Sequence, residues 1–213
     1  MILKQALRII AQLLVGSELR HWLDDPKEDH FAPRFARPGI DMTIDAFPRS
    51  ANTWIYYQAQ LAYPHAKIAH HIHSWQHFFF SKLFGVPSVL IVREPDGAVQ
   101  SLAVKKGGSL ALGYLDYIIT NGLGSLFADR VHFFDELTGD GGMTGLFSDM
   151  TERLGGEPTT VDPDEVRKLM AKRTDHKNVK TPAFRHDELG RFACIMRSAA
   201  NKVYARIERE WRV

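Results

Sequence analysis

Residues 40–54 have the sequence IDMTIDAFPRSANTW, and the fold depends on the change of pattern within them. Apolar and polar residues alternate from Ile40 to Phe47, which is typical of a β-strand of about eight residues. Pro38-Gly39 and Pro48 bound this segment, and Thr53–Ala62 then has the pattern of a helix. The sequence therefore predicts a strand, a short loop and a helix in immediate succession.

The same succession recurs along the chain. Further strands are predicted at Ala66–His70, Pro87–Val92 and Arg130–Phe134, and the second of these is a continuous apolar run typical of a buried parallel strand. Helices are predicted at Gln76–Leu83, Asp96–Lys105, Leu110–Asn121, Thr144–Leu154, Asp162–Ala171 and Asp187–Arg209. Because strands alternate with helices, we expect a three-layer α/β/α fold with a central parallel sheet.

Length and charge limit the classes of function. A chain of 213 residues usually forms one domain, so we expect a single domain with an N-terminal helix and loop (1–38), a core (39–156) and C-terminal helices (157–213). Basic residues exceed acidic ones only by 27 − 25 = 2. Since proteins that bind nucleic acids or anionic membranes through their whole surface carry a much larger excess, we expect no nucleic-acid partner. Any bound anion must be held by a local group of residues.

The N-terminal segment and the cysteine content bear on location. Apolar residues recur there at helical spacing: Ile2, Leu3, Leu7, Ile10 and Leu14. This pattern favours an amphipathic helix packed on the domain over a membrane-surface helix or a leader peptide, and the run Ile9–Gly16 is far shorter than the roughly 20 residues of a membrane span. Cys194 is the only cysteine, which excludes an internal disulfide and suits a reducing compartment, so we expect a soluble, cytoplasmic protein.

The loop that follows the first predicted strand has the composition of an anion site. Backbone N–H groups and the positive end of a helix dipole attract anions at such a position. Further donors come from the side chains of Arg49, Ser50, Asn52 and Thr53. The ATPase signature GxxxxGK[ST] is absent. The alternative is an ordinary turn in which a Ser or Thr caps the helix.

A second loop of this kind follows the strand Val89–Val92. Arg93 stands at the strand end, and Ser101 lies one to two turns into the next helix, so the guanidinium and the hydroxyl can bind one phosphate together. The alternative is that Arg93 pairs with Glu94 or Asp96 at the surface. Two anion-binding loops on neighbouring strands favour the phosphate site.

Together, PRSANTW (48–54) and LIVREPDGAVQS (90–101) resemble the cofactor loops of the sulfotransferase family. The resemblance continues through VHFFDEL (131–137) to Leu154-Gly155 and covers residues 40–156. It implies a P-loop NTPase-like fold that binds 3′-phosphoadenosine 5′-phosphosulfate (PAPS) and transfers its sulfuryl group to a hydroxyl or amine of a small-molecule or glycan acceptor, with no metal required. By this resemblance Arg93 and Ser101 bind the 3′-phosphate. The 5′-phosphosulfate would be bound by the loop that contains Arg49, Ser50, Ala51, Asn52, Thr53 and Trp54. Trp54 would stack on the adenine, as in the family, or pack into the core.

The chain also departs from the family pattern. Arg49 stands where the family usually has Lys, and Phe134 stands where it often has Tyr. Ala51 replaces a Gly, so we expect no positive φ there. The Arg-Lys-Gly clamp of the 3′-phosphate is absent near the C-terminus, where Lys177, Lys180 and Arg185 are its possible replacements.

Histidines cluster in the segment HHIHSW (70–75). Sulfuryl transfer needs a base, a role that histidine suits near neutral pH, and in the resembled family a histidine of this loop performs it. By its sequence distance from Arg93 we favour His71, with His73 next. On an extended segment these two share a face and His70 points away, which indicates a structural role for His70. Two alternatives are a metal site built from His70, His71, His73 and His77, and polar filler with His65 and His77 at the surface.

The leading hypothesis is therefore a sulfotransferase. Arg49 and the loop amides would stabilise charge on the leaving oxygen, and His71 would accept the acceptor proton. One alternative is a kinase or other phosphoryl transferase of the same fold, which would need magnesium ligands. Another is a non-catalytic binding module that has kept the anion loops.

Overall fold

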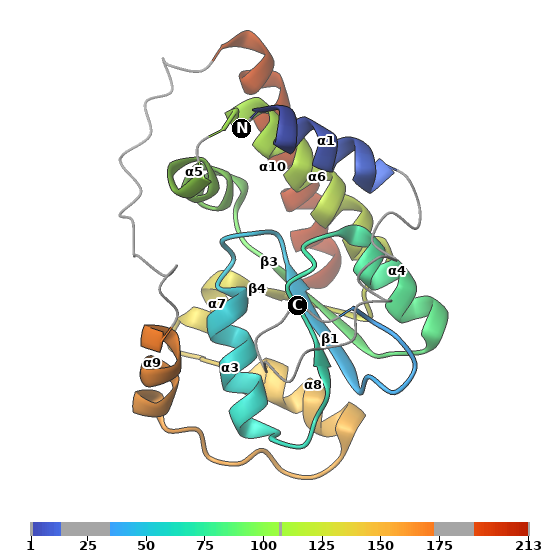
Figure 1. Ribbon diagram of the computed structural model, residues 1–213, viewed down its shortest axis with the longest axis vertical. Coiled ribbons are helices and arrows are strands. Elements are labelled where there is room, and N and C mark those ends of the chain that lie inside the picture. Colours follow the sequence, from blue (N-terminus) through green and yellow to red (C-terminus); the bar gives the residue numbers. More distant parts are fainter. Residues whose placement is uncertain (1, 14–34, 107, 173–189, 213) are drawn as a thin grey trace.

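The structure is a computed structural model that describes residues 2–13, 35–106, 108–172 and 190–212. Its sheet contains β1 (Met42–Ala46), β2 (Ile68–Ala69), β3 (Ser88–Val92) and β4 (Arg130–Phe133). The four strands are parallel and lie in the order β2-β1-β3-β4 (Figure 1). The predicted parallel α/β fold is confirmed within the described residues.

The predicted helices are also present; the bounds of Thr144–Leu154 are confirmed, most of the other ends are shifted, and the predicted start of the last helix at Asp187 lies outside the described residues. They are α1 (Ile2–Leu13), α3 (Asn52–Ala62), α4 (Trp75–Phe84), α5 (Pro95–Lys106), α6 (Leu110–Phe127), α8 (Thr144–Leu154), α9 (Pro163–Lys172) and α10 (Arg191–Trp211), and the short α7 (Phe134–Thr138) was not predicted. Helix α6 was predicted to end at Asn121, which is wrong: the helix continues to Phe127 and contains Gly122 and Gly124. A Cβ at Gly124 would lie 3.2 Å from the ring of Phe78, so this glycine allows α4 and α6 to pack closely.

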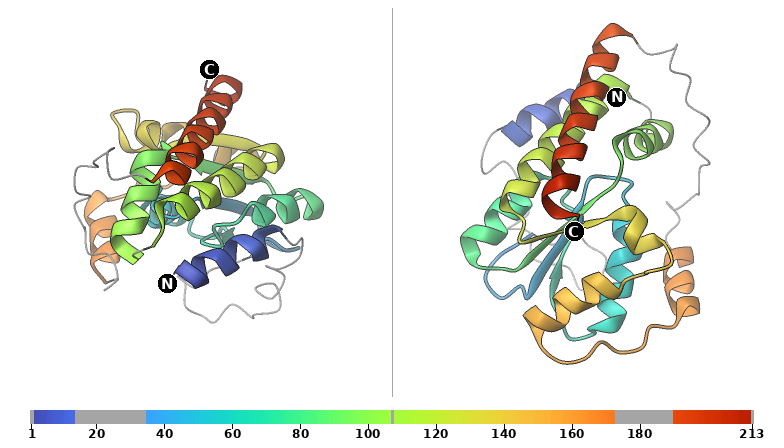
Figure 2. Two further views of the ribbon diagram at one scale, coloured as in Figure 1. Left: turned by 90° about the horizontal axis from the view of Figure 1, so that it is seen from above. Right: turned by 180° about the vertical axis from the view of Figure 1, so that it is seen from behind.

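Helices cover both faces of the sheet, an arrangement compatible with the expected three layers (Figure 2). Alternate residues of β3 point to opposite sides. Val89 and Ile91 belong to a core with α3 and α8, whereas Leu90 and Val92 belong to a core with α4 and α10. The uninterrupted apolar sequence of β3 therefore reflects burial on both faces.

The strand order determines where the loops meet. Helix α3 leads from β1 to β2 on one side, and the chain then crosses to β3 on the other side of β1. In open parallel sheets, ligands bind at the carboxyl ends of the strands beside such a change of direction. The loops after β1, β2 and β3 are therefore brought together at the carboxyl ends of the strands.

Helix α1 exists as predicted, but its predicted packing face is wrong. It packs on α6 and α4 through Ile9, which is buried with Trp75 and Ile119. Most of the stripe that was expected to face the domain is exposed instead: Ile2, Leu3, Leu7 and Ile10. Leu14 lies outside the described residues. Among the described helices, none has the length and apolar character needed to cross a membrane.

Candidate active site

A cleft of about 370 Å³ opens at the carboxyl ends of β1 and β3. Its walls come from the loops after β1, β2 and β3, from α5, and from α7 and α9. The lining residues are Pro48, Arg49, Ala51, Asn52, Thr53, Trp54, His71, His73, Arg93, Leu102, Lys105, Lys106, Phe134 and Met170. The fold therefore brings eight of the ten predicted site residues to one cleft, and Ser50 and Ser101 lie behind its surface, buried.

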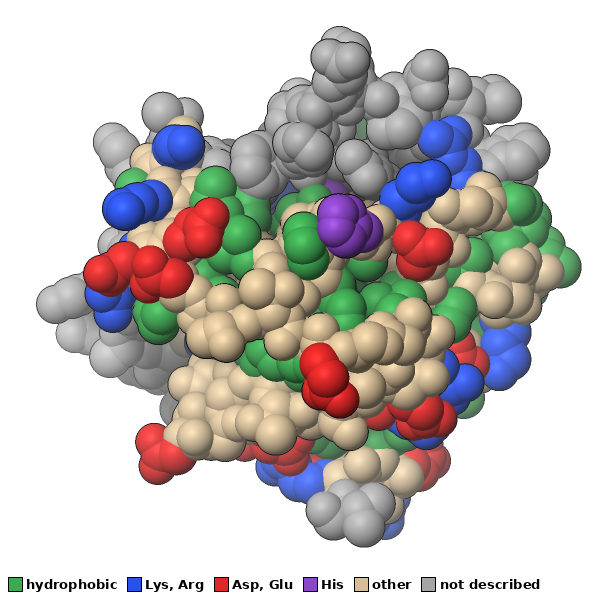
Figure 3. Space-filling model, turned by 90° about the horizontal axis from the view of Figure 1, so that it is seen from below, with side chains coloured by type: hydrophobic (Ala, Val, Ile, Leu, Met, Phe, Trp, Pro, Cys, Tyr) green, Lys and Arg blue, Asp and Glu red, His purple; other side chains and the backbone are tan. Residues whose placement is uncertain are grey.

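A larger groove of about 700 Å³ lies near the amino ends of the strands, between Tyr63, His65 and Arg153. Figure 3 views the molecule from this side, where acidic and basic side chains are interspersed. We place the site at the smaller cleft because the carboxyl ends of the strands, and two arginines that follow β1 and β3, are found there.

Backbone strain also distinguishes the smaller cleft. The non-glycine residues with positive φ in the described part of the chain are Arg49 (74°), Ala51 (57°), His71 (63°) and His73 (57°), and all of them line this cleft. A left-handed conformation costs a non-glycine residue roughly 1–2 kcal/mol. Such strain is typical of functional sites, where the surrounding structure holds the backbone in place. The expectation that Ala51 would avoid positive φ is wrong.

The loop after β1 is not an ordinary capped turn. Ala51 occupies the N-cap position of α3, and no side chain caps the helix there. Thr53 Oγ1 instead lies 2.9 Å from His71 Nε2. The Ser50 hydroxyl is buried and has no hydrogen-bond partner among the described residues. Within the described residues, the N-cap side chain thus makes no hydrogen bond to the first N–H groups of α3, at a position that favours anions.

The two loop arginines are held side by side. Arg93 Nη1 donates to the Arg49 carbonyl at 2.9 Å, and Arg49 Nε donates to Ser101 Oγ at 2.9 Å. Ser101 thus supports Arg49, whereas the sequence paired it with Arg93. Burial, together with the charge of Arg93, lowers the pKa of the Arg49 guanidinium. Two neighbouring cations of this kind favour binding of an anion between them.

Arg93 has further contacts. Its Nε donates to Glu94 Oε2 at 3.2 Å, so the surface pairing considered for this residue is present as well. Its guanidinium lies 4.5 Å from the ring centroid of Phe134, which lines the same cleft. Asp96, the other possible partner, pairs with Arg197 of α10. These contacts fix the position of Arg93 at the cleft.

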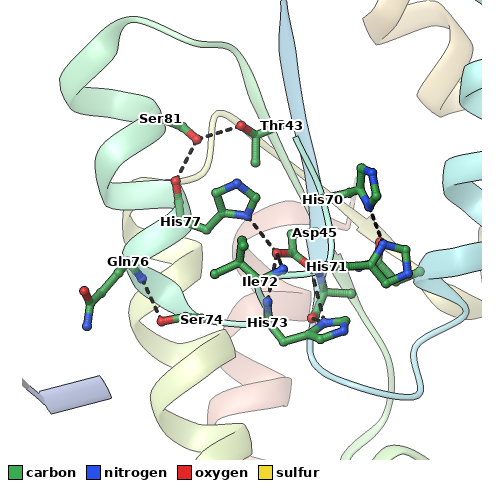
Figure 4. Close-up of polar contacts among 12 residues, drawn as sticks. Thr43, Asp45, His70, His71, Ile72, His73, Ser74, Gln76, His77 and Ser81 are labelled. Atoms are coloured by element: carbon green, nitrogen blue, oxygen red, sulfur yellow. Dashed lines mark hydrogen bonds and ion pairs between the residues drawn. The ribbon is translucent and has the colours of Figure 1, made fainter. Parts of the chain in front are cut away.

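Asp45, at the end of β1, connects the loops behind the cleft (Figure 4). Its Oδ1 accepts hydrogen bonds from the Ala46 N–H (2.8 Å) and Asn52 Nδ2 (2.7 Å). Its Oδ2 accepts from the backbone N–H groups of Ile72 and His73 (both 2.9 Å) and from His77 Nδ1 (2.7 Å). A single carboxylate therefore joins β1, the start of α3, the histidine loop and α4.

The Asp45 carboxyl is fully buried, and its environment favours the ionised form. Burial by itself raises the pKa, but hydrogen bonds and charge from His73 and His77 outweigh burial and hold the pKa of Asp45 well below its usual value. The network thus places a negative charge directly behind the histidine loop.

The histidines occupy distinct positions. His71 and His73 line the cleft and His70 is buried, as predicted, although left-handed turns at positions 71 and 73, and not an extended strand, produce this arrangement. His70 packs on Tyr56 with 3.8 Å between ring centroids. The alternative that placed His77 at the surface is wrong because its side chain is completely buried, whereas His65 is exposed.

The hydrogen bonds of His73 assign its tautomer. Its Nδ1 lies 2.7 Å from the carbonyl oxygen of Ala46, which can only accept, so Nδ1 carries the proton and Nε2 is the basic nitrogen. His71 differs, since its Nδ1 faces His70 Nδ1 and its Nε2 faces the Thr53 hydroxyl. His73 therefore has the geometry of a base that is oriented by a carboxylate 3.3 Å from its Nδ1.

Three further predictions concern Trp54, the replacements for the missing 3′-phosphate clamp, and a metal site. Trp54 is half-buried, lines the cleft and also packs on the core around α3. Three possible replacements for the missing clamp, Lys177, Lys180 and Arg185, lie outside the described residues. Within the described ranges, no group of three His, Cys, Asp or Glu residues is arranged to hold a metal ion.

Asp45 and the two lysines of the cleft, Lys105 and Lys106, were not predicted. An acidic residue inside an otherwise buried strand was the signal for Asp45, because such a charge requires partners. Lys105 and Lys106 could have been predicted because they are consecutive cations at the end of the helix that follows the second anion loop. They add positive charge to the lining of the cleft.

Comparisons with known proteins found no match among family models, curated proteins or solved structures.

Proposed function

We propose that the protein is a sulfotransferase that binds PAPS in the cleft and transfers the sulfuryl group to a hydroxyl or amine. The observation that carries the proposal is the convergence of the strained loop after β1 with Arg93 after β3 around one cleft that also contains His71 and His73. A donor that carries phosphate groups at both the 3′ and the 5′ position of its ribose needs two such anion subsites.

The residues of the cleft fit this donor. Arg49 and the N–H groups at the start of α3 would hold the 5′-phosphosulfate, and Arg93 would hold the 3′-phosphate. Phe134 and Trp54 supply apolar surface for the adenine. When bound, the donor supplies an activated sulfuryl group, and the protein positions the acceptor and moves one proton.

His73 is the base in this proposal. Its Nε2 accepts the proton of the acceptor hydroxyl while the acceptor oxygen forms a bond to sulfur and the bond from sulfur to the phosphate oxygen breaks. Arg49 and the N–H groups of α3 stabilise the negative charge on the leaving phosphate. The Asp45 carboxylate and the Ala46 carbonyl hold the His73 ring in the required tautomer.

Calorimetric titration tests the donor. We expect 3′-phosphoadenosine 5′-phosphate to bind without magnesium and far more tightly than AMP, and Arg93→Ala to weaken it about 10- to 100-fold through loss of a charge-assisted contact. Arg153→Ala, at the opposite groove, is the matched control. ATP binding that requires magnesium, with no preference for the 3′-phosphate, would identify a phosphoryl transferase and reject the proposal.

Turnover of radiolabelled PAPS with a panel of hydroxyl and amine acceptors tests catalysis. We expect His73→Ala to lower kcat about 10²- to 10⁴-fold with unchanged donor affinity, which is the range for loss of a general base. His65→Ala, which removes an exposed histidine, is the control. Donor binding with no transfer to any acceptor would indicate a binding module.

A further inference from the structure

Helix α1 has an apolar face that the rest of the protein leaves exposed. Five of the ten large hydrophobic side chains that are exposed in the described residues belong to this helix of 12 residues. Their exposed fractions lie between 55% and 70%: Ile2, Leu3, Leu7, Ile10 and Leu13. So dense a group of exposed aliphatic side chains indicates an interaction surface.

The helix is attached to the domain by a different edge. Gln5 Nε2 donates to the Ser109 carbonyl at 3.3 Å, and the Ser109 N–H donates to Gln5 Oε1 at 3.2 Å. Ile9, on the same edge, is 5% exposed. Figure 2 shows α1 at the periphery of the molecule, outside α6. The attachment therefore fixes the helix with its apolar face directed outward.

From this arrangement we infer that α1 docks the protein on an anionic lipid bilayer. The helix sequence contains Lys4 and Arg8 and no acidic residue, and Lys105-Lys106 directly precede the segment on which Gln5 packs. An apolar face combined with cations is typical of helices that lie in the membrane interface. At 1.5 Å per residue the helix is about 18 Å long, shorter than the ~30 Å hydrocarbon core, so it lies on the bilayer.

Size and composition favour lipid over a protein partner. A stable protein interface involves roughly 20–30 residues on each side and is enriched in aromatic residues and Arg. The exposed face of α1 offers five side chains, all Leu or Ile. A second copy of the chain would therefore gain too little buried area from this face, whereas acyl chains accept aliphatic side chains without a matching shape.

Vesicle flotation of the full chain tests the inference and uses no turnover, so its result is independent of the proposed function. We expect binding to vesicles that contain phosphatidylglycerol, weaker binding in high salt and little binding to pure phosphatidylcholine. Replacement of Leu3, Leu7 and Ile10 by Gln should weaken binding about 100-fold, because each of these side chains loses its apolar transfer energy. Leu83→Gln, on α4 with 63% exposure, is the matched control.

Circular dichroism and thermal unfolding establish that the triple variant folds, and Leu7→Gln with Lys4→Gln replaces it if it does not. Wild-type protein that does not float with anionic vesicles overturns the inference, as does a folded triple variant that floats equally well. Sedimentation of the lipid-free protein tests whether the apolar face of α1 instead binds a second copy of the chain. A dimer that the same substitutions dissociate would assign the face to a second copy.

Discussion

At the residue scale, Asp45 organises more of the cleft than any residue that contacts its surface. Its two oxygens accept five hydrogen bonds of 2.7–2.9 Å, which come from β1, α3, the histidine loop and α4. A buried carboxylate is stable only when it is satisfied in this way. The hydrogen bonds in turn fix a loop in which His71 and His73 have left-handed backbones.

We predict that Asp45→Asn destabilises the protein by about 3 kcal/mol, because an amide places a donor where the carboxylate accepts and leaves buried N–H groups unpaired. Urea unfolding measures the change. Asp41→Asn is the control, since Asp41 is exposed just before the same strand and, in the described part of the chain, accepts a hydrogen bond from the Lys67 N–H at 2.7 Å. Equal losses in the two variants would contradict the role given to Asp45.

The low pKa of Asp45 also predicts a dependence of stability on pH. Because the pKa is lower in the folded than in the unfolded state, the stabilisation is complete above the unfolded pKa of about 3.9. It is lost as the pH falls through the folded pKa, which lies well below that value. The difference in the free energy of unfolding between wild type and Asp45→Asn should therefore be larger at about pH 5 than below about pH 4, where it should shrink. A constant difference down to the acid limit of folding would contradict this prediction.

At the scale of elements, α5 carries the second anion loop and is held by helices distant in sequence. Asp96, in the first turn of α5, accepts hydrogen bonds from Arg197 Nε of α10 at 2.9 and 3.0 Å and from the Tyr114 hydroxyl of α6 at 2.8 Å. The Tyr117 hydroxyl donates to the Arg93 carbonyl at 2.7 Å. The position of Arg93 therefore depends on α6 and α10.

We predict that Arg197→Ala lowers the affinity for 3′-phosphoadenosine 5′-phosphate about 3- to 10-fold and lowers stability by about 1 kcal/mol, because the bond is partly exposed and screened by solvent. Calorimetry and urea unfolding measure the two effects. Arg209→Ala removes an exposed arginine from the same helix and should change neither. An affinity that does not change in Arg197→Ala would show that α5 keeps its position without α10.

The elements were largely predictable, whereas several contacts at the site were not. Hydrophobic periodicity located each strand, and the rule that parallel strands end at one edge placed Arg49, Arg93 and the histidines together. Three of the five hydrogen bonds to Asp45 come from residues 27 to 32 positions away, which no local pattern reveals. The left-handed backbone of Ala51 is imposed by tertiary contacts against its intrinsic preference.

At the scale of the whole molecule, positive charge is concentrated although the net charge is only +2. Arg49, Arg93, Lys105 and Lys106 line one cleft, and the contacts that support the two arginines reach α5, α6 and, through α5, α10. Helices that are distant in sequence therefore help to determine the geometry of the cleft. A ligand that binds Arg49 and Arg93 together is expected to stabilise the folded state as a whole.

This coupling predicts a thermal shift. A ligand that binds only the folded state adds about 2.7 kcal/mol at about 100 times its Kd, and for a chain of this size 1 kcal/mol raises Tm by about 2–4 °C. We therefore expect 3′-phosphoadenosine 5′-phosphate to raise Tm by about 5–11 °C at that concentration, and AMP at the same concentration to raise it far less. Scanning calorimetry measures both shifts. The shift should fall to about half or less in Arg93→Ala, because binding that is about 10- to 100-fold weaker leaves only about 0.4–1.4 kcal/mol of stabilisation at the same ligand concentration. It should be retained in Arg209→Ala, and an unchanged shift in Arg93→Ala would place the ligand away from the loops after β1 and β3.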